Sequence, residues 1–174
     1  MKGQDFETTI TVPLEMAYKG GKQRVSLRNG LNHQSINVTI PAGIESGKKL
    51  RLVGKGGPAP SGGTPGNLYI VVNVAPHPHF ERKGADLEYT AKIGLSDALL
   101  GTTITIPTMD NEEKQLKIPA GSSPGTKMRI KGYGFPHMKG DKKGDLYVKI
   151  EVQFPSSLTK KQQELIEQIR EAGL

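Results

Sequence analysis

Two histidines stand one residue apart near the middle of the chain, and imidazole nitrogens are common metal ligands. His77 and His79 flank Pro78. A catalytic zinc ion usually needs three protein ligands, and no acidic cluster lies nearby in the sequence. The chain contains no cysteine, which removes thiolate ligands, thiol nucleophiles and disulfide bonds. We therefore expect no metal site, and the absence of cysteine fits a reducing compartment.

The other polar motifs indicate neither nucleophilic catalysis nor phosphate binding. Serine, histidine and aspartate occur, but the Gly-x-Ser-x-Gly motif of a nucleophile elbow is absent. The pairs Gly54-x-Gly56 and Gly132-x-Gly134 lie between expected strands with no helix after them. A phosphate cradle needs the N-terminus of a helix, so these glycines fit turns instead. We expect no catalytic residue, no enzyme activity and no cofactor.

The net charge leaves two interpretations open. The chain has 24 Lys and Arg against 17 Asp and Glu, which gives a formal charge of +7. This excess is either an ordinary solvated surface or an attraction to acidic partners such as nucleic acid. Lys139, Lys142 and Lys143 share one expected loop, yet aromatic residues are only 5% and no basic recognition helix is evident. Non-specific DNA binding is the main alternative function, and its steep salt dependence would distinguish it.

The sequence contains an internal repeat, which predicts how the chain is divided into domains. A shift of 78 positions lays Ile-Pro-Ala-Gly at 40–43 on the same residues at 118–121, and Leu-Tyr at 68–69 on 146–147. The segment 15–20 instead finds its counterpart at 96–101, a shift of 81, so a three-residue length difference lies in between. Such a repeat marks one folding unit used twice. We expect a first domain at 1–79, a second domain at 80–155 and a C-terminal helix within 156–174.

Apolar residues alternate with polar ones within both copies, which is the period of a β-strand. The predicted fold class is mainly β, with two tandem, similar β-sandwich-like domains, short helical turns and a C-terminal helix. The turns are expected at 15–19 and 96–100, and Asn29-Gly30 predicts a hairpin. Residues 75–84 should link the copies. The expected strands are 8–14, 23–28, 35–40, 49–53 and 68–74, then 87–95, 102–106, 113–118, 127–131 and 145–152.

The C-terminal segment changes to a helical pattern over 158–172. Thr159 with Gln162 fits a capping box at the start of this helix. Leu165, Ile166 and Ile169 form one apolar stripe, which either the protein's own domain or a second chain must cover.

Two further patterns bear on localisation. No stretch reaches the ~20 apolar residues of a membrane span. The N-terminus also lacks the apolar run of a signal peptide. We expect a cytoplasmic protein that does not associate with membranes.

The order and spacing of several segments resemble the C-terminal substrate-binding region of the DnaJ or Hsp40 family of co-chaperones. The segments that carry the resemblance are 13–20, 40–43 with 49–51, 77–87, 95–101 and 144–147. The J domain with its His-Pro-Asp signature, the glycine/phenylalanine-rich linker and the Cys-x-x-Cys repeats of a zinc domain are missing. The chain therefore resembles the class without zinc, similar to the bacterial curved-DNA-binding co-chaperone, truncated to two β domains and a terminal helix.

The resemblance implies a function and a site. It implies binding of unfolded or extended apolar polypeptide, delivery of these clients to Hsp70 by the full-length protein, and a homodimer formed through Leu165, Ile166 and Ile169. Without a J domain, no stimulation of the Hsp70 ATPase is expected. The implied groove lies in the first copy, with Thr8 and Gln23 beside it, and the alternatives are ordinary core residues or a purely structural assembly module. The implied groove residues are Ile10, Val25, Leu27 and Ile70.

Overall fold

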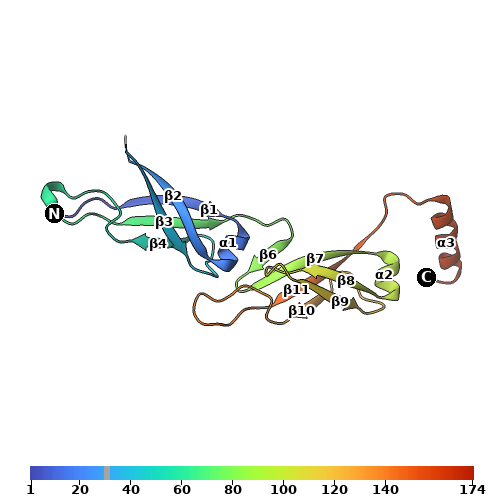
Figure 1. The fold of residues 1–174 in the computed structure, drawn as a ribbon. Coiled ribbons are helices and arrows are strands. Elements are labelled where there is room, and N and C mark those ends of the chain that lie inside the picture. The colour runs from blue at the N-terminus through green and yellow to red at the C-terminus, as the bar shows by residue number, and fades with distance from the viewer. Residues whose placement is uncertain (30–31) are drawn as a thin grey trace.

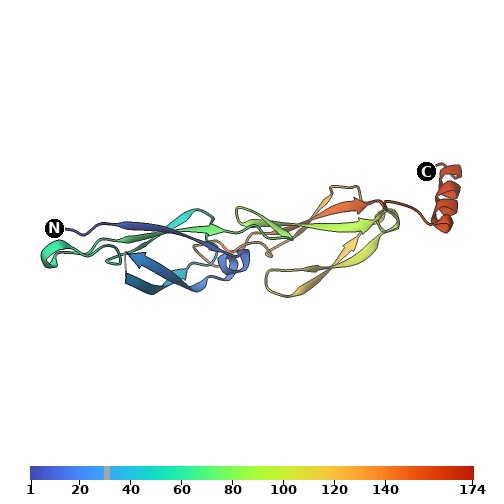
Figure 2. The ribbon, with the colours of Figure 1, turned by 90° about the horizontal axis from the view of Figure 1, so that it is seen from above.

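The structure, a computed structural model, describes residues 1–29 and 32–174. Two similar β units follow one another along a common axis, and a short helix stands beyond the second unit (Figures 1 and 2). The predicted mainly β fold with a C-terminal helix is confirmed. The expected hairpin turn at Asn29-Gly30 falls at the gap, outside the described residues.

The first unit packs a three-stranded sheet against a hairpin. Strand β5 (Leu68–Val74) lies at the centre, parallel to β1 (Phe6–Val12) and antiparallel to β4 (Lys48–Leu52). The hairpin pairs β2 (Gly21–Asn29) with β3 (Asn32–Ile40). Helix α1 (Leu14–Lys19) connects β1 to β2, and a short 3-10 turn, η1 (Pro60–Gly62), interrupts the loop before β5.

The second unit repeats this plan and adds one strand. Its sheet has the order β10 (Lys127–Ile130), β11 (Leu146–Gln153), β7 (Asp86–Gly94) and β6 (Phe80–Lys83). Its hairpin pairs β8 (Thr102–Pro107) with β9 (Glu113–Ile118), and α2 (Leu95–Leu100) connects β7 to β8. The segment 75–84 was expected to link the copies, but residues 80–83 pair with β7 and so belong to the second sheet.

The register of the sheets follows the repeat in the sequence. Phe6 stands opposite Leu68 in the first sheet, and their counterparts Leu87 and Leu146 stand opposite each other in the second. The three-residue length difference lies in the hairpins, which span 21–40 in the first unit and 102–118 in the second. The first hairpin is therefore the longer one.

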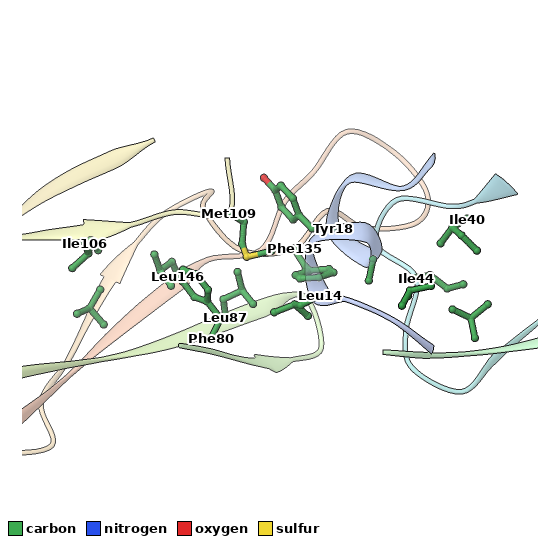
Figure 3. Close-up of a cluster of buried hydrophobic side chains, with 14 of the residues drawn as sticks. Leu14, Tyr18, Ile40, Ile44, Phe80, Leu87, Ile106, Met109, Phe135 and Leu146 are labelled. Carbon is green, nitrogen blue, oxygen red and sulfur yellow. The ribbon is translucent and has the colours of Figure 1, made fainter. Parts of the chain in front are cut away.

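Each core is built from the inward residues of the central strand. Leu68, Ile70 and Val72 of β5 are at most 1% exposed, as are their counterparts on β11. Each such side chain contributes about 1.5–3 kcal/mol on burial. Aromatic and aliphatic residues between the two units, among them Tyr18, Phe80 and Phe135, join the cores into one buried cluster (Figure 3).

The outer strands β4 and β10 carry basic residues. Lys48, Lys49 and Arg51 occupy β4, and Lys127 and Arg129 occupy β10. The corresponding outer strands of the two sheets are therefore both basic.

Helix α3 (Lys160–Glu171) stands apart from both units (Figure 1). Its predicted capping box is confirmed, because the Thr159 hydroxyl accepts a bond from the Gln162 amide at 3.1 Å and the Gln162 side chain accepts one from the Thr159 amide at 2.9 Å. All of its residues are exposed, including the apolar stripe of Leu165, Ile166 and Ile169. Over the described residues, no helix combines the length and apolar character needed to cross a membrane.

Candidate functional site

A groove of about 690 Å³ opens between the hairpin and the sheet of the first unit. Its apolar lining comes from Phe6 on β1, Leu27 on β2 and Leu68 on β5, with Thr8 beside them. Burial decreases along β2 from Val25, which is 5% exposed, to Leu27, which is half-buried. The sandwich therefore spreads apart toward the far end of the hairpin, and this opening forms the groove.

The four residues implied by the resemblance lie at different depths. Leu27 lines the groove. Ile10 is half-buried on β1, in register with Val72. Val25 and Ile70 are 5% and 0% exposed and lie in the core. The structure thus brings Leu27 to the opening, while Val25 and Ile70 support it from within the sandwich.

Phe6 and Leu68 also line the groove, although the sequence did not single them out. The two residues are paired in register at the beginning of β1 and β5. The alternation of Phe6, Thr8, Ile10 and Val12 could have extended the inward face of β1 by one more residue. Thr8, expected beside the groove, does line it.

The matching end of the second unit carries different side chains, and the one at the position of Thr8 is larger. Tyr89 takes the place of Thr8, and its ring packs on Phe80 of β6 with the centroids 5.6 Å apart. Thr108 takes the place of Leu27, is 5% exposed and donates its hydroxyl hydrogen to the Glu112 carbonyl at 2.8 Å. A small residue at Thr8 and a longer hairpin therefore leave space in the first unit that the second unit fills.

Strand β2 offers a backbone edge next to this groove. Within the described part of the chain, β2 pairs with β3 alone, so its opposite edge faces no other strand. The amide and carbonyl groups of such an edge can pair with an added extended segment. The groove therefore combines an apolar lining with unpaired backbone groups.

Charged residues surround the apolar centre. Asp5, Glu7, Arg28 and Lys55 line the groove. The Asp5 carboxylate accepts the Asn67 amide at 2.7 Å, and Glu7 forms an ion pair with Lys49 at 3.3 Å. The two acidic groups are thus engaged within the protein.

The histidine pair and the lysine loop also have structural partners. His77 lies 2.8 Å from the Glu15 carboxylate through Nε2, and its Nδ1 accepts the backbone amides of His79 and Phe80. No group of three potential metal ligands occurs within residues 1–29 and 32–174. Lys143 donates to the Tyr18 hydroxyl at 2.7 Å, so one lysine of the basic loop is held in place.

Comparison with known proteins places this geometry in a family. Residues 6–155 match the family described as the DnaJ C terminal domain. The chaperone protein DnaJ of Pelagibacter ubique is 45% identical over 138 residues, which are 79% of this chain and 37% of the relative. The DnaJ of Leptospira biflexa is 45% identical over 141 residues, 80% of this chain and 38% of the relative. That of Methanothermobacter thermautotrophicus is 46% identical over 132 residues, 76% and 35% of the two chains.

The chain thus spans well under half the length of these relatives. The family match covers both β units and ends before α3. This match confirms the resemblance of the sequence to the C-terminal region of the DnaJ family. The chain belongs to the family of DnaJ C-terminal domains.

Proposed function

We propose that this chain binds extended, apolar stretches of unfolded polypeptide and serves as the client-binding part of an Hsp40 co-chaperone. In the cytoplasm, the whole co-chaperone would deliver these clients to Hsp70. The observation that supports this proposal best is the groove beside the free edge of β2. The edge suits any extended backbone, and the apolar lining selects for aliphatic or aromatic side chains. Sequence preference should be loose, because ladder hydrogen bonds do not depend on side-chain identity.

A single groove should bind weakly. Each aliphatic side chain buried by the ligand contributes about 1–3 kcal/mol, and ordering the ligand costs several kcal/mol. Leu27 and Phe6, which are half-buried, supply the contacts at the opening, and the buried Leu68 lies behind them. Ile10, Val25 and Ile70 would keep the two layers at the spacing that the opening requires.

The direct test is Leu27→Asp, with affinity for a fluorescent apolar peptide measured by anisotropy. A carboxylate at the opening should weaken binding at least tenfold, since it must be desolvated by the ligand. Leu27 is half-buried, so the fold should persist, whereas an aspartate at Val25, which is 5% exposed, should unfold the unit. Ile104→Asp on β8, also half-buried, is the matched control. Unchanged affinity in a folded Leu27→Asp variant rejects the groove.

Salt dependence separates this function from DNA binding. Apolar peptide binding should change little between 50 and 200 mM salt, whereas a basic surface that binds phosphates loses affinity steeply, by about 10³–10⁵ for many contacts. Lys49, Lys127 and Arg129 are engaged in ion pairs with carboxylates, which reduces their availability for phosphates.

We further propose a homodimer formed through α3. The stripe of Leu165, Ile166 and Ile169 is 36–43% exposed. Leu99 and Leu100 are 47% and 80% exposed on α2, which lies at the same end of the molecule as α3 (Figure 1). A second copy could cover both surfaces, and two linked grooves would bind one client more tightly through effective concentration. Sedimentation should give a dimer that Ile169→Glu dissociates. A monomeric wild type at working concentration excludes it.

A further inference from the structure

The base of the β2–β3 hairpin is held by the second unit. Helix α1 leads into β2, and the turn at residues 41–44 follows β3. The two segments are joined, because the Gly43 amide donates to the Ala17 carbonyl at 2.7 Å. A loop and strand β6 of the second unit contact these segments, through Asp110 and Arg82.

The first contact is made by Tyr18 of α1. Its hydroxyl donates to the Asp110 carboxylate at 2.6 Å and accepts from the Lys143 ammonium at 2.7 Å. Its ring meets Phe135 edge-on, with the centroids 5.5 Å apart (Figure 3). Burial raises the pKa of Tyr18, and the bond to Tyr18 raises the pKa of Lys143. The hydroxyl and the ammonium therefore keep their protons at neutral pH.

The second contact is made by Arg82 of β6. Its guanidinium donates to the carbonyls of Gly43 and Ile44 and lies 3.9 Å from the centre of the Phe135 ring. A β-carbon on Gly43 would stand 2.2 Å from the Pro136 carbonyl oxygen, so the backbones of the two units touch there. A guanidinium with two backbone acceptors and an aromatic face is fixed in orientation.

Among residues 1–29 and 32–174, no equivalent contacts hold the base of the second hairpin. Leu99 replaces Tyr18 at the equivalent position of α2 and is 47% exposed. Gly121, the counterpart of Gly43, keeps the amide bond to α2 but has no atom within 4 Å of an added β-carbon. The contacts at Tyr18 and Gly43 are therefore additions to the repeated fold, and they act on the unit with the open groove.

We propose that the second unit sets the width of the groove in the first, through Tyr18 with Asp110 and Lys143 and through Arg82 with Gly43 and Ile44. The hairpin forms one wall of the groove, and the sheet forms the other. Fixing the base of the hairpin fixes the angle at which it leaves the sheet. None of the side chains that make these contacts lines the groove, so they act as positioning residues. They are Tyr18, Arg82, Asp110 and Lys143. The inference rests on the proposed client-binding function.

The test compares Tyr18→Phe and Arg82→Met with the wild type. Tyr18→Phe keeps the ring against Phe135 and removes the two hydrogen bonds of the hydroxyl. Because the chain has no cysteine, spin labels at Ser35→Cys on β3 and Asn73→Cys on β5 report the distance between hairpin and sheet. Tyr147→Phe on β11 makes the same chemical change away from the junction and is the matched control.

The wild type and Tyr147→Phe should give one narrow distance distribution. Both junction variants should broaden it and raise the Kd for an apolar peptide about fivefold, since the ligand must then order the groove. An unchanged distribution, or a broadened one with unchanged Kd, rejects this inference alone. Failure of the wild type to bind any apolar peptide rejects the proposed function and this inference with it.

Discussion

Thr8 and Tyr89 occupy the same position in the two repeats and differ in what they leave open. Thr8 lines the groove, whereas the ring of Tyr89 packs on Phe80. Two copies of one fold can thus differ in the space that they leave open through the volume of one side chain. The sequence predicts on which face of a strand a side chain lies but not how deeply it is buried. Alternation assigns both Val25 and Leu27 to the same face of β2. Only the spreading of the two layers separates the buried Val25 from the half-buried Leu27.

Thr8→Tyr should close the groove with the residue that the second unit already uses. We expect peptide affinity to fall at least tenfold while the unfolding free energy changes by less than about 1 kcal/mol, because the ring enters an existing space. Anisotropy and urea unfolding measure the two quantities. Thr11→Tyr, on the exposed face of the same strand, is the control and should leave affinity intact. Full affinity in Thr8→Tyr would place the client elsewhere.

Ion pairs connect side chains on different strands within each sheet. Glu88 on β7 contacts Lys83 of β6 at 3.0 Å and Lys127 of β10 at 2.9 Å, and Glu7 contacts Lys49 in the equivalent place of the first sheet. The strand pattern was largely predictable, since alternation and turn residues mark most strands within a few positions. Strand β6 could not be predicted from the sequence, because its four residues follow two prolines. These residues form a strand only by pairing with β7.

The bonds from Lys127 and Lys83 lower the pKa of Glu88. Stability from a carboxylate with a lowered pKa is present above its ordinary pKa and disappears as pH falls through the lowered value. Glu88→Gln should therefore destabilise the protein at pH 7, by less than about 1 kcal/mol because both lysines are about half exposed to solvent, and have no effect near pH 2. Urea unfolding at both pH values measures this. Glu151→Gln, exposed on β11, is the control, and an equal loss at both pH values contradicts the assignment.

The whole molecule behaves as two copies of one unit with an asymmetric junction. The repeat in the sequence predicted the copies and their order, and the matched register of the two sheets follows from it. It could not predict the junction, because Tyr18 and Arg82 find their partners in loops that are distant in the sequence. The same limit applies to the groove, whose walls come from different layers.

Gly43 and Gly121 provide a comparison that isolates the junction. Both have positive φ, +85° and +76°, so alanine at either position costs about 1–2 kcal/mol through backbone strain. Only at Gly43 does the added β-carbon meet the other unit, at 2.2 Å from the Pro136 oxygen. Urea unfolding should therefore show a larger loss for Gly43→Ala than for Gly121→Ala, by about 2 kcal/mol. Equal losses would mean that the junction contributes little.

The proposed function requires that an extended apolar peptide pairs with the free edge of β2. Amide hydrogen exchange along residues 23–28, measured by NMR with and without a saturating apolar peptide, tests it most directly. We expect slower exchange at alternate residues of β2, those whose amides point away from β3, and no change along β8. Unchanged exchange on β2 when the peptide is bound, or protection confined to β8 or α3, would contradict it.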